Sequence, residues 1–382
     1  MEIPIDYESL RVIWWGLMGV LLIAFAATDG FDLGVAALLP FIAHTDAERR
    51  MVINTIGPTW EGNQVWFILG GGAIFAAWPF VYAVSFSGFY LAMFVVLCAL
   101  ILRPVGFKYR SKREDERWRA FWDWALFTGG FVPALVFGVA VGNVLTGVPF
   151  RLDADLRAFY EGTFLGLFTP FTLLCGVLSV AMLVLHGAAW LTMKAEKGPV
   201  RDRARLYGMF AGLLAILCFA GGNLWAAHGD LGFRIVEGVD PAGASNPLRM
   251  LSEAAPGAWL SNFAQHSWMW IAPVLGYAGL AIAVLGVALA IEALAFSGST
   301  LAVAGIIATV GLSMFPYILP STIDPRSSLT VWNASSSHLT LFVMLILTVI
   351  FLPLVLAYTA WVYKVLWGRV TTRDVTSNPS MY

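Results

Sequence analysis

Apolar residues occur in long runs along this chain, and polar residues gather in the segments between the runs. A helix that crosses the hydrocarbon core of a bilayer needs about 20 mainly apolar residues, whereas a barrel strand needs only about 9–11. The runs have the helical length, and a helix satisfies its own backbone polar groups inside the bilayer. The pattern therefore predicts an all-α integral membrane protein. Nine runs qualify as transmembrane helices: 11–34, 62–79, 82–104, 122–145, 164–192, 206–227, 267–290, 300–318 and 338–364.

The composition supports the same class of protein. Of the 382 residues, 59% are hydrophobic and 12% are charged, whereas a soluble domain is about 45–50% apolar and about 25% charged. So little charge cannot cover a water-facing surface, which excludes soluble and disordered chains. The formal net charge is −1, so no overall field attracts nucleic acid. We therefore expect contact with membrane lipid and no nucleic-acid partner.

The basic residues are distributed unevenly about the nine predicted helices. Sixteen of the 23 Lys and Arg residues lie in the loops 44–60, 105–121 and 193–205 or at the C-terminal end, whereas six lie on the opposite side. Cytoplasmic loops carry an excess of Lys and Arg. We therefore expect the N-terminus outside and the C-terminus in the cytoplasm. Residues 1–370 then form a single polytopic membrane domain, and 371–382 form a polar, loosely ordered cytoplasmic tail.

Asp29 and Asp32 lie within the first predicted helix, three residues apart and therefore on one helix face. A charge inside the bilayer is costly and usually marks a functional site. Two neighbouring carboxylates also repel each other, which suits a site that takes up and releases protons. The alternative is a helix end at Gly30 and Gly34 with solvated carboxylates, and the sequence favours neither interpretation.

A second polar group lies at the predicted start of the second helix, where Glu61 follows Trp60 and precedes Asn63 and Gln64. The helix dipole favours an acid at this position, which alone would explain Glu61. The segment nevertheless holds more polar groups than a helix cap requires. We therefore favour a role for Glu61 in proton uptake beside the first-helix carboxylates.

Arg103 precedes Pro104, where the proline predicts the end of the third helix. Two roles are open for its side chain. It would either extend to the membrane interface or neutralise Asp29, Asp32 or Glu61, all assigned to the same inner half of the membrane.

Candidate cofactor ligands are sparse. A haem between helices needs an axial ligand such as His or Met at membrane depth, and among the histidines only His186 and His338 could serve. A lone His within a helix is more often a hydrogen-bonded packing residue. Motifs for metal-dependent hydrolysis, nucleotide binding and acyl transfer are also missing. We therefore predict no metal site in this chain.

Two classes of function agree with these features. A proton-coupled secondary transporter would use the buried carboxylates, but it should also show Gly- or Pro-interrupted helices at matching positions of two halves. The sequence contains no such matched pair. A subunit of a membrane redox complex needs apolar helix faces, few internal charges and carboxylates towards one side. The second class fits better, and the transporter remains the alternative.

Several motifs, spread from the first predicted helix to the last, are specific when taken together. They include Thr28-Asp-Gly-Phe-Asp-Leu-Gly34, Trp60-Glu-Gly-Asn-Gln-Val-Trp66, Gly71-Gly-Ala-Ile-Phe-Ala-Ala-Trp-Pro79, Arg103-Pro-Val-Gly-Phe-Lys-Tyr-Arg-Ser111 and Ser328-Leu-Thr-Val-Trp-Asn-Ala-Ser-Ser336. With these motifs the chain closely resembles the subunit II family of bacterial cytochrome bd ubiquinol oxidases.

The resemblance implies nine transmembrane helices in the bacterial inner membrane. It also implies a heterodimer with a larger subunit I, often joined by a short single-span accessory peptide. Such complexes of the respiratory chain oxidise quinol, reduce dioxygen to water and take protons from the cytoplasm. Their haem b and haem d are ligated by subunit I, so the resemblance implies no catalytic residue in this chain.

The resemblance further implies roles for individual residues. Asp29, Asp32 and Glu61 match carboxylates that are associated with a proton pathway in the family. Glu61 stands where a familiar member has Asp, so its side chain reaches one methylene further. Some members hold a structural quinone in this subunit, and the matching positions here are Trp60 and Arg103, with Asp32 nearby.

Overall fold

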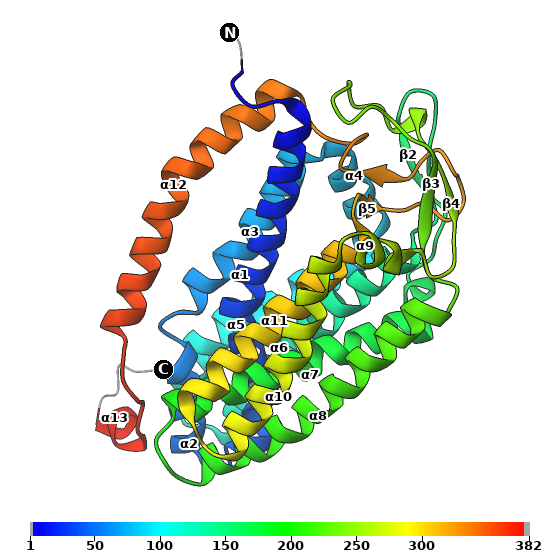
Figure 1. The fold of residues 1–382 in the computed structure, drawn as a ribbon. Helices are drawn as coiled ribbons and strands as arrows, with labels where there is room; N and C mark the ends of the chain where they lie inside the picture. Colours follow the sequence, from blue (N-terminus) through cyan, green and yellow to red (C-terminus); the bar gives the residue numbers. More distant parts are fainter. Residues whose placement is uncertain (1–2, 378–382) are drawn as a thin grey trace.

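The computed structural model describes residues 3–377, and the chain is mainly helical (Figure 1). Within these residues, eight helices are long and apolar enough to cross a membrane, which agrees with an all-α membrane protein. They are α1 (Tyr7–Ile42), α5 (Tyr90–Tyr109), α6 (Glu116–Thr146), α7 (Pro170–Lys194), α8 (Pro199–His228), α10 (Ile271–Ala288), α11 (Glu292–Met314) and α12 (His338–Val365).

Shorter elements connect the long helices. The α-helices among them are α2 (Asp46–Ile56), α3 (Trp60–Ala77), α4 (Pro79–Gly88), α9 (Ser261–Gln265) and α13 (Thr372–Ser377). The 3-10 helices are η1 (Arg110–Lys112), η2 (Leu165–Leu167), η3 (Pro247–Arg249), η4 (Ala258–Leu260) and η5 (Ser267–Trp270). The strands are β1 (Phe150–Leu152), β2 (Ala158–Tyr160), β3 (Phe233–Glu237), β4 (Leu251–Ala254), β5 (Tyr317–Leu319) and β6 (Leu329–Thr330).

In the described part of the chain, the strands form three antiparallel pairs, β1–β2, β3–β4 and β5–β6. Figure 1 shows labelled strands of each pair together at the upper end of the helical bundle, which we term the hairpin end. Val148 forms a bridge with Ser321, joining the segments that follow α6 and α11. Tyr7 Oη donates to the carbonyl oxygen of Ser336 at 2.5 Å. The first turn of α1 and the start of α12 therefore also lie at the hairpin end.

The opposite end holds α2 and α13, and we term it the α2 end (Figure 1). Arg110 Nη1 donates to Asp46 Oδ1 of α2 at 3.0 Å. Arg203 of α8 forms an ion pair with Glu48 of α2 at 2.7 Å. The basic loops that follow α5 and α7 are thus gathered around α2.

The second and third predicted helices differ from the observed ones. Residues 62–79 correspond to α3, which is 18 residues long but is not among the eight long apolar helices. The first turn of α3 is polar and lowers the apolar content of the helix. Residues 82–104 are divided between α4 and α5, because the chain turns at Phe89.

Pro104 lies inside α5, which continues to Tyr109. The prediction that this proline ends the helix is wrong. The residues beyond it are held by packing, since Phe107 is buried and Gly106 faces the side chain of Leu126 on α6. Burial of apolar surface thus compensates for the backbone hydrogen bond that the proline cannot donate.

α1 passes through Gly30 and Gly34 without a break and ends only at Ile42. The alternative of a helix end at these glycines is therefore wrong. Gly34 instead permits close packing, because a Cβ atom there would lie 1.9 Å from the carbonyl oxygen of Leu183 on α7. The small residues let α1 approach α7 closely, as is typical of helices packed in membranes.

The predicted loosely ordered tail, 371–382, contains a short helix, α13. Its Val375 is fully buried in the core cluster formed at the α2 end. The expectation of loose order is wrong for residues 372–377, because this buried side chain anchors them. Residues 378–382 lie outside the described part of the chain.

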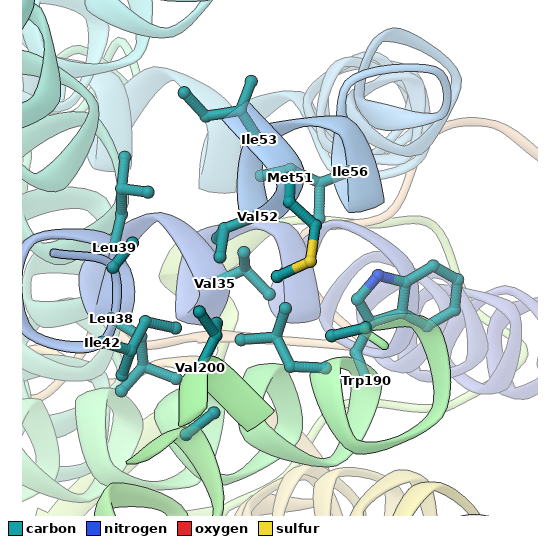
Figure 2. Packing of buried hydrophobic residues seen from close by; sticks show 14 of the residues in the cluster. Val35, Leu38, Leu39, Ile42, Met51, Val52, Ile53, Ile56, Trp190 and Val200 are labelled. Carbon is teal, nitrogen blue, oxygen red and sulfur yellow. The ribbon is translucent and has the colours of Figure 1, made fainter. Parts of the chain in front are cut away.

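Apolar side chains from α1, α2, α7 and α8 form the core of the α2 end, and α2 covers the last turns of α1. Figure 2 shows the packing of Val35, Leu38, Leu39, Ile42, Met51, Val52, Ile53, Ile56, Trp190 and Val200. A capping box fixes the start of α2, because Thr45 accepts from the backbone of Glu48 and Glu48 accepts from the backbone of Thr45.

Candidate functional site

Arg103 and Asp29 form a buried ion pair between α5 and α1. Arg103 Nη2 donates to Asp29 Oδ1 at 2.8 Å, and Nη1 donates to Oδ2 at 3.1 Å. The two side chains are 0% and 1% exposed. This two-pronged geometry is the strongest that a guanidinium offers a carboxylate. Of the two roles open to Arg103, the structure supports charge neutralisation.

Asp32 lies beside this pair, one turn further along α1. Its Oδ2 atom is 4.0 Å from Arg103 Nη2 and accepts a hydrogen bond from Asn63 Nδ2 at 2.8 Å. Two carboxylates thus share one guanidinium. The cluster carries one negative charge when both acids are ionised, and a single added proton neutralises it. Such a group can hold and release one proton deep inside the protein.

Two buried polar atoms of the cluster have no hydrogen-bond partner within residues 3–377. They are Asp32 Oδ1 and Arg103 Nε. The indole ring of Trp60 lies next to the guanidinium, with 5.9 Å between Arg103 Cζ and the ring centroid. Trp60 also contacts Phe107 of α5 at 5.3 Å between ring centroids. A free donor, a free acceptor and an aromatic face therefore occur within one small region.

The neighbouring helix α6 leaves room for the arginine. A Cβ atom at Gly129 would lie 2.8 Å from Arg103 Cγ and 3.0 Å from the carbonyl oxygen of Ala99. Only a glycine lets the aliphatic part of Arg103 pass between α5 and α6. Gly129 thus helps to position the guanidinium, although α6 contributes no charged side chain to the cluster.

Glu61 is not brought into contact with the other predicted carboxylates. It lies in the first turn of α3 with its side chain exposed. The Glu61 side chain forms no hydrogen bond or ion pair with any of residues 3–377. Its neighbours on the same exposed face, Val65 and Ile68, are apolar. Glu61 is thus accessible from outside the subunit, whereas Asp29 and Asp32 are not.

The two candidate haem ligands are both hydrogen-bonded to the protein. His186 is fully buried, with Nδ1 2.7 Å from Ser299 Oγ and Nε2 3.0 Å from the carbonyl oxygen of Ala27. The Nε2 atom of His338 lies 2.7 Å from the carbonyl oxygen of Ile5. Both nitrogens of His186 are engaged, so its arrangement supports a packing role.

The sequence interpretation did not find two features of the site. Tyr363 of α12 donates from its hydroxyl to Asn63 Oδ1 at 2.6 Å. Asn63 was visible within the Trp60 motif, but nothing in the sequence pairs it with a residue 300 positions away. Arg110 was counted only as a loop cation, although it is buried and donates to Asp123 Oδ1 at 2.5 Å.

Comparisons with known proteins give a consistent result over nearly the whole chain. Residues 10–366 match the family described as cytochrome bd terminal oxidase subunit II. The chain is 49% identical over 374 residues to the cytochrome bd-I ubiquinol oxidase subunit 2 of Escherichia coli, covering 98% of each chain. It is 31% identical over 372 residues to the cytochrome bd ubiquinol oxidase subunit 2 of Bacillus subtilis, covering 96% of this chain and 98% of the relative.

A solved structure has a similar fold. It is described as the structure of bd oxidase from Geobacillus thermodenitrificans, and the matching chain superposes with a TM-score of 0.63 at 15% sequence identity. The match covers 94% of this chain and 98% of the other. At this identity the likeness shows a shared fold.

Proposed function

The chain belongs to the cytochrome bd terminal oxidase subunit II family, and on this basis we propose that it helps to deliver cytoplasmic protons for the reduction of dioxygen by quinol. The chain is a subunit of a membrane oxidase complex and a multi-pass protein of the bacterial inner membrane. The transporter alternative has no support, because the relatives over the full chain are oxidase subunits.

Nine transmembrane helices, with the N-terminus outside and the C-terminus in the cytoplasm, are the topology we propose. The ninth helix is α3, whose 18 residues would extend about 27 Å against a hydrocarbon core of about 30 Å. It begins next to α2, and its last residue contacts the segment that precedes α12 at the hairpin end, where Ser336 N donates to the carbonyl oxygen of Ala77 at 2.8 Å. The excess of basic residues at the α2 end supports a cytoplasmic location for that end.

Haem cofactors and a subunit I partner follow from the family. The finer assignment is a proposal: haem b and haem d are ligated by subunit I, and a short single-span peptide joins the complex. The engaged nitrogens of His186 support ligation outside this chain. The haems would supply the electron transfer and oxygen chemistry, while this chain would bind subunit I and carry protons.

The proton role is carried by one observation, the pair of buried carboxylates that shares a single guanidinium. Asp29 and Asp32 would hold one exchangeable proton in a region that lipid and bulk water do not reach. Glu61, exposed in the first turn of α3, would take up protons from the cytoplasmic side. The separation of Glu61 from the buried pair means that water or subunit I would have to connect them.

A structural quinone would fit the same region chemically. Arg103 Nε is a buried donor without a partner among the described residues, and a quinone carbonyl is an acceptor. Trp60 offers an aromatic face to the ring beside it. We therefore assign Trp60 and Arg103, with Asp32 nearby, to a structural quinone site.

Oxygen uptake of the purified complex tests the proton role. Asp29→Asn and Glu61→Gln should each slow quinol-dependent oxygen uptake while the reduced-minus-oxidised haem spectrum keeps its bands. Glu114→Gln, an exposed acid in the loop after α5, is the matched control and should leave both unchanged. Loss of haem from the Asp29 or Glu61 variants would make these residues structural and overturn the proton role. A colourless protein without a partner would overturn the oxidase assignment itself.

A further inference from the structure

A line of hydrogen bonds connects the carboxylate pair to helix α12. The Tyr363 hydroxyl donates to Asn63 Oδ1 at 2.6 Å, and Asn63 Nδ2 donates to Asp32 Oδ2 at 2.8 Å. Asp32 is 0% and Asn63 2% exposed, so water does not compete for these bonds. The line thus joins three helices, α12, α3 and α1, through side chains alone.

Both hydrogen bonds point towards Asp32. An amide group has one donor side and one acceptor side, so the hydroxyl proton of Tyr363 on Oδ1 holds the Nδ2 side of Asn63 towards the carboxylate. The opposite orientation would place two oxygens, Asn63 Oδ1 and Asp32 Oδ2, against each other. That orientation becomes favourable only when Asp32 carries a proton that it can donate. The orientation of Asn63 is therefore tied to the protonation of Asp32.

The tyrosine end of this line lies on the long helix with the least packing. Leu341 is the buried residue of α12, and Figure 1 shows α12 set apart from the other long helices along much of its length. The Tyr363 ring contacts Trp190 of α7 edge to face, with ring centroids 6.2 Å apart. The hydroxyl of Tyr363 thus adds a polar bond to a helix that has few apolar contacts with the rest of the chain.

We propose that Asn63 and Tyr363 are positioning residues that orient Asp32 for proton exchange and link its protonation to α12. The inference rests on the proposed proton role of Asp32. The charged groups that face Asp32 from the surrounding helices are Asp29 of α1 and Arg103 of α5, and both are already engaged with each other. Asn63 therefore supplies a neutral hydrogen bond to Asp32 Oδ2, while Oδ1 has no partner among the described residues.

Infrared difference spectroscopy of the purified complex tests this proposal directly. The carboxyl band of Asp32 is the one that Asp32→Asn removes. Asn63→Leu should move this band, because the carboxyl loses its hydrogen-bond donor. Tyr363→Phe, which keeps the ring contact with Trp190, should move it less. Tyr358→Phe is the matched control on α12, since its exposed hydroxyl makes no hydrogen bond to the described residues, and it should leave the band in place.

Oxygen uptake distinguishes the positioning role of Asn63 and Tyr363 from the proton role of Asp32 on which it rests. Asn63→Leu and Tyr363→Phe should slow uptake by about two- to tenfold, the equivalent of one neutral hydrogen bond. If Asp32→Asn slows uptake but neither variant moves the band, the positioning role is overturned and the proton role stands. If the band moves but Asp32→Asn leaves uptake unchanged, the proton role fails while the hydrogen-bonded line is real. If the complex with Asn63→Leu does not assemble, the Tyr363→Phe variant alone tests the proposal.

Discussion

Arg103 has both terminal nitrogens bonded to Asp29, so neither side chain faces lipid as an isolated charge. Attraction between such groups only offsets the cost of removing them from water. The pair is therefore weak evidence for stability when intact. Removing one partner is destabilising, because the other partner then remains as a buried charge without compensation.

Arg103→Leu should destabilise the assembled complex by about 3–5 kcal/mol, since it leaves Asp29 unpaired. Adding Asp29→Asn to this variant should recover part of the loss, because the unpaired charge is then removed. Thermal unfolding of the complex in detergent, followed by haem absorption and quinone content, measures both effects. Arg117→Leu, at an exposed cation in the first turn of α6, is the control and should unfold like wild type. Wild-type stability and quinone content of Arg103→Leu would reduce this residue to an interface anchor.

Among individual residues, local spacing predicted which side chains share a helix face. It did not predict contacts between residues that are far apart in the sequence. The three-residue interval between Asp29 and Asp32 placed both on one helix face. The partner of each depended on contacts between helices. Arg103 is 74 positions from Asp29, and Tyr363 is 300 positions from Asn63. A single sequence shows no periodicity over such intervals, so the pairings could not be deduced from it.

Helices α10 and α11 pack so closely at their glycines that a side chain larger than hydrogen would not fit. A Cβ atom at Gly286 would lie 2.3 Å from the backbone nitrogen of Ala295, and one at Gly305 would lie 2.2 Å from that of Gly276. Association of helices in lipid depends on such close backbone approach. The sequence predicted both helices from their apolar runs but not this contact, because glycines occur throughout the chain.

Gly286→Ala should destabilise the subunit by about 1–3 kcal/mol, the usual cost of overpacking, because the added methyl group meets backbone that cannot yield. Gly222→Ala on α8 should have the opposite sign. A Cβ atom there meets nothing within 4 Å, and alanine favours the helix by up to about 1 kcal/mol. Thermal unfolding of the two variants, each compared with wild type, tests the contrast. Equal effects would show that the α10–α11 contact is looser than the structure has it.

The elements that sequence analysis missed share a physical cause. α2 is short and mixed in polarity, so it resembles a loop in any count of apolar residues. The strands are two to five residues long and, apart from the start of β5, lie outside the predicted apolar runs. The break at Phe89 lies inside an apolar run, where composition gives no signal. Apolar length therefore predicted the long helices well, while turns and short elements depended on tertiary contacts.

The whole molecule has two chemically different ends joined by its long helices. The hairpin end gathers the N-terminal turn and the three strand pairs, and Arg11 is fully buried there with Nη2 donating to the carbonyl oxygen of Gly243 at 3.0 Å. The α2 end gathers the basic loops around α2. Each loop joins the end that the charge pattern assigned to it. This grouping requires that α3 runs from one end to the other, as the proposed ninth transmembrane helix would.

Labelling of single cysteines in intact cells, in a cysteine-free background, distinguishes nine transmembrane helices from eight. Glu8 precedes α3 and Glu237 follows it; both side chains are exposed at the hairpin end. If α3 crosses the membrane, a membrane-impermeant thiol reagent should label both Glu8→Cys and Glu237→Cys from outside. Glu114→Cys, in the basic loop after α5, should react only after the membrane is opened. With eight crossings Glu8 and Glu237 would lie on opposite sides, so labelling of only one of them would overturn both the count and the proposed path of protons from Glu61.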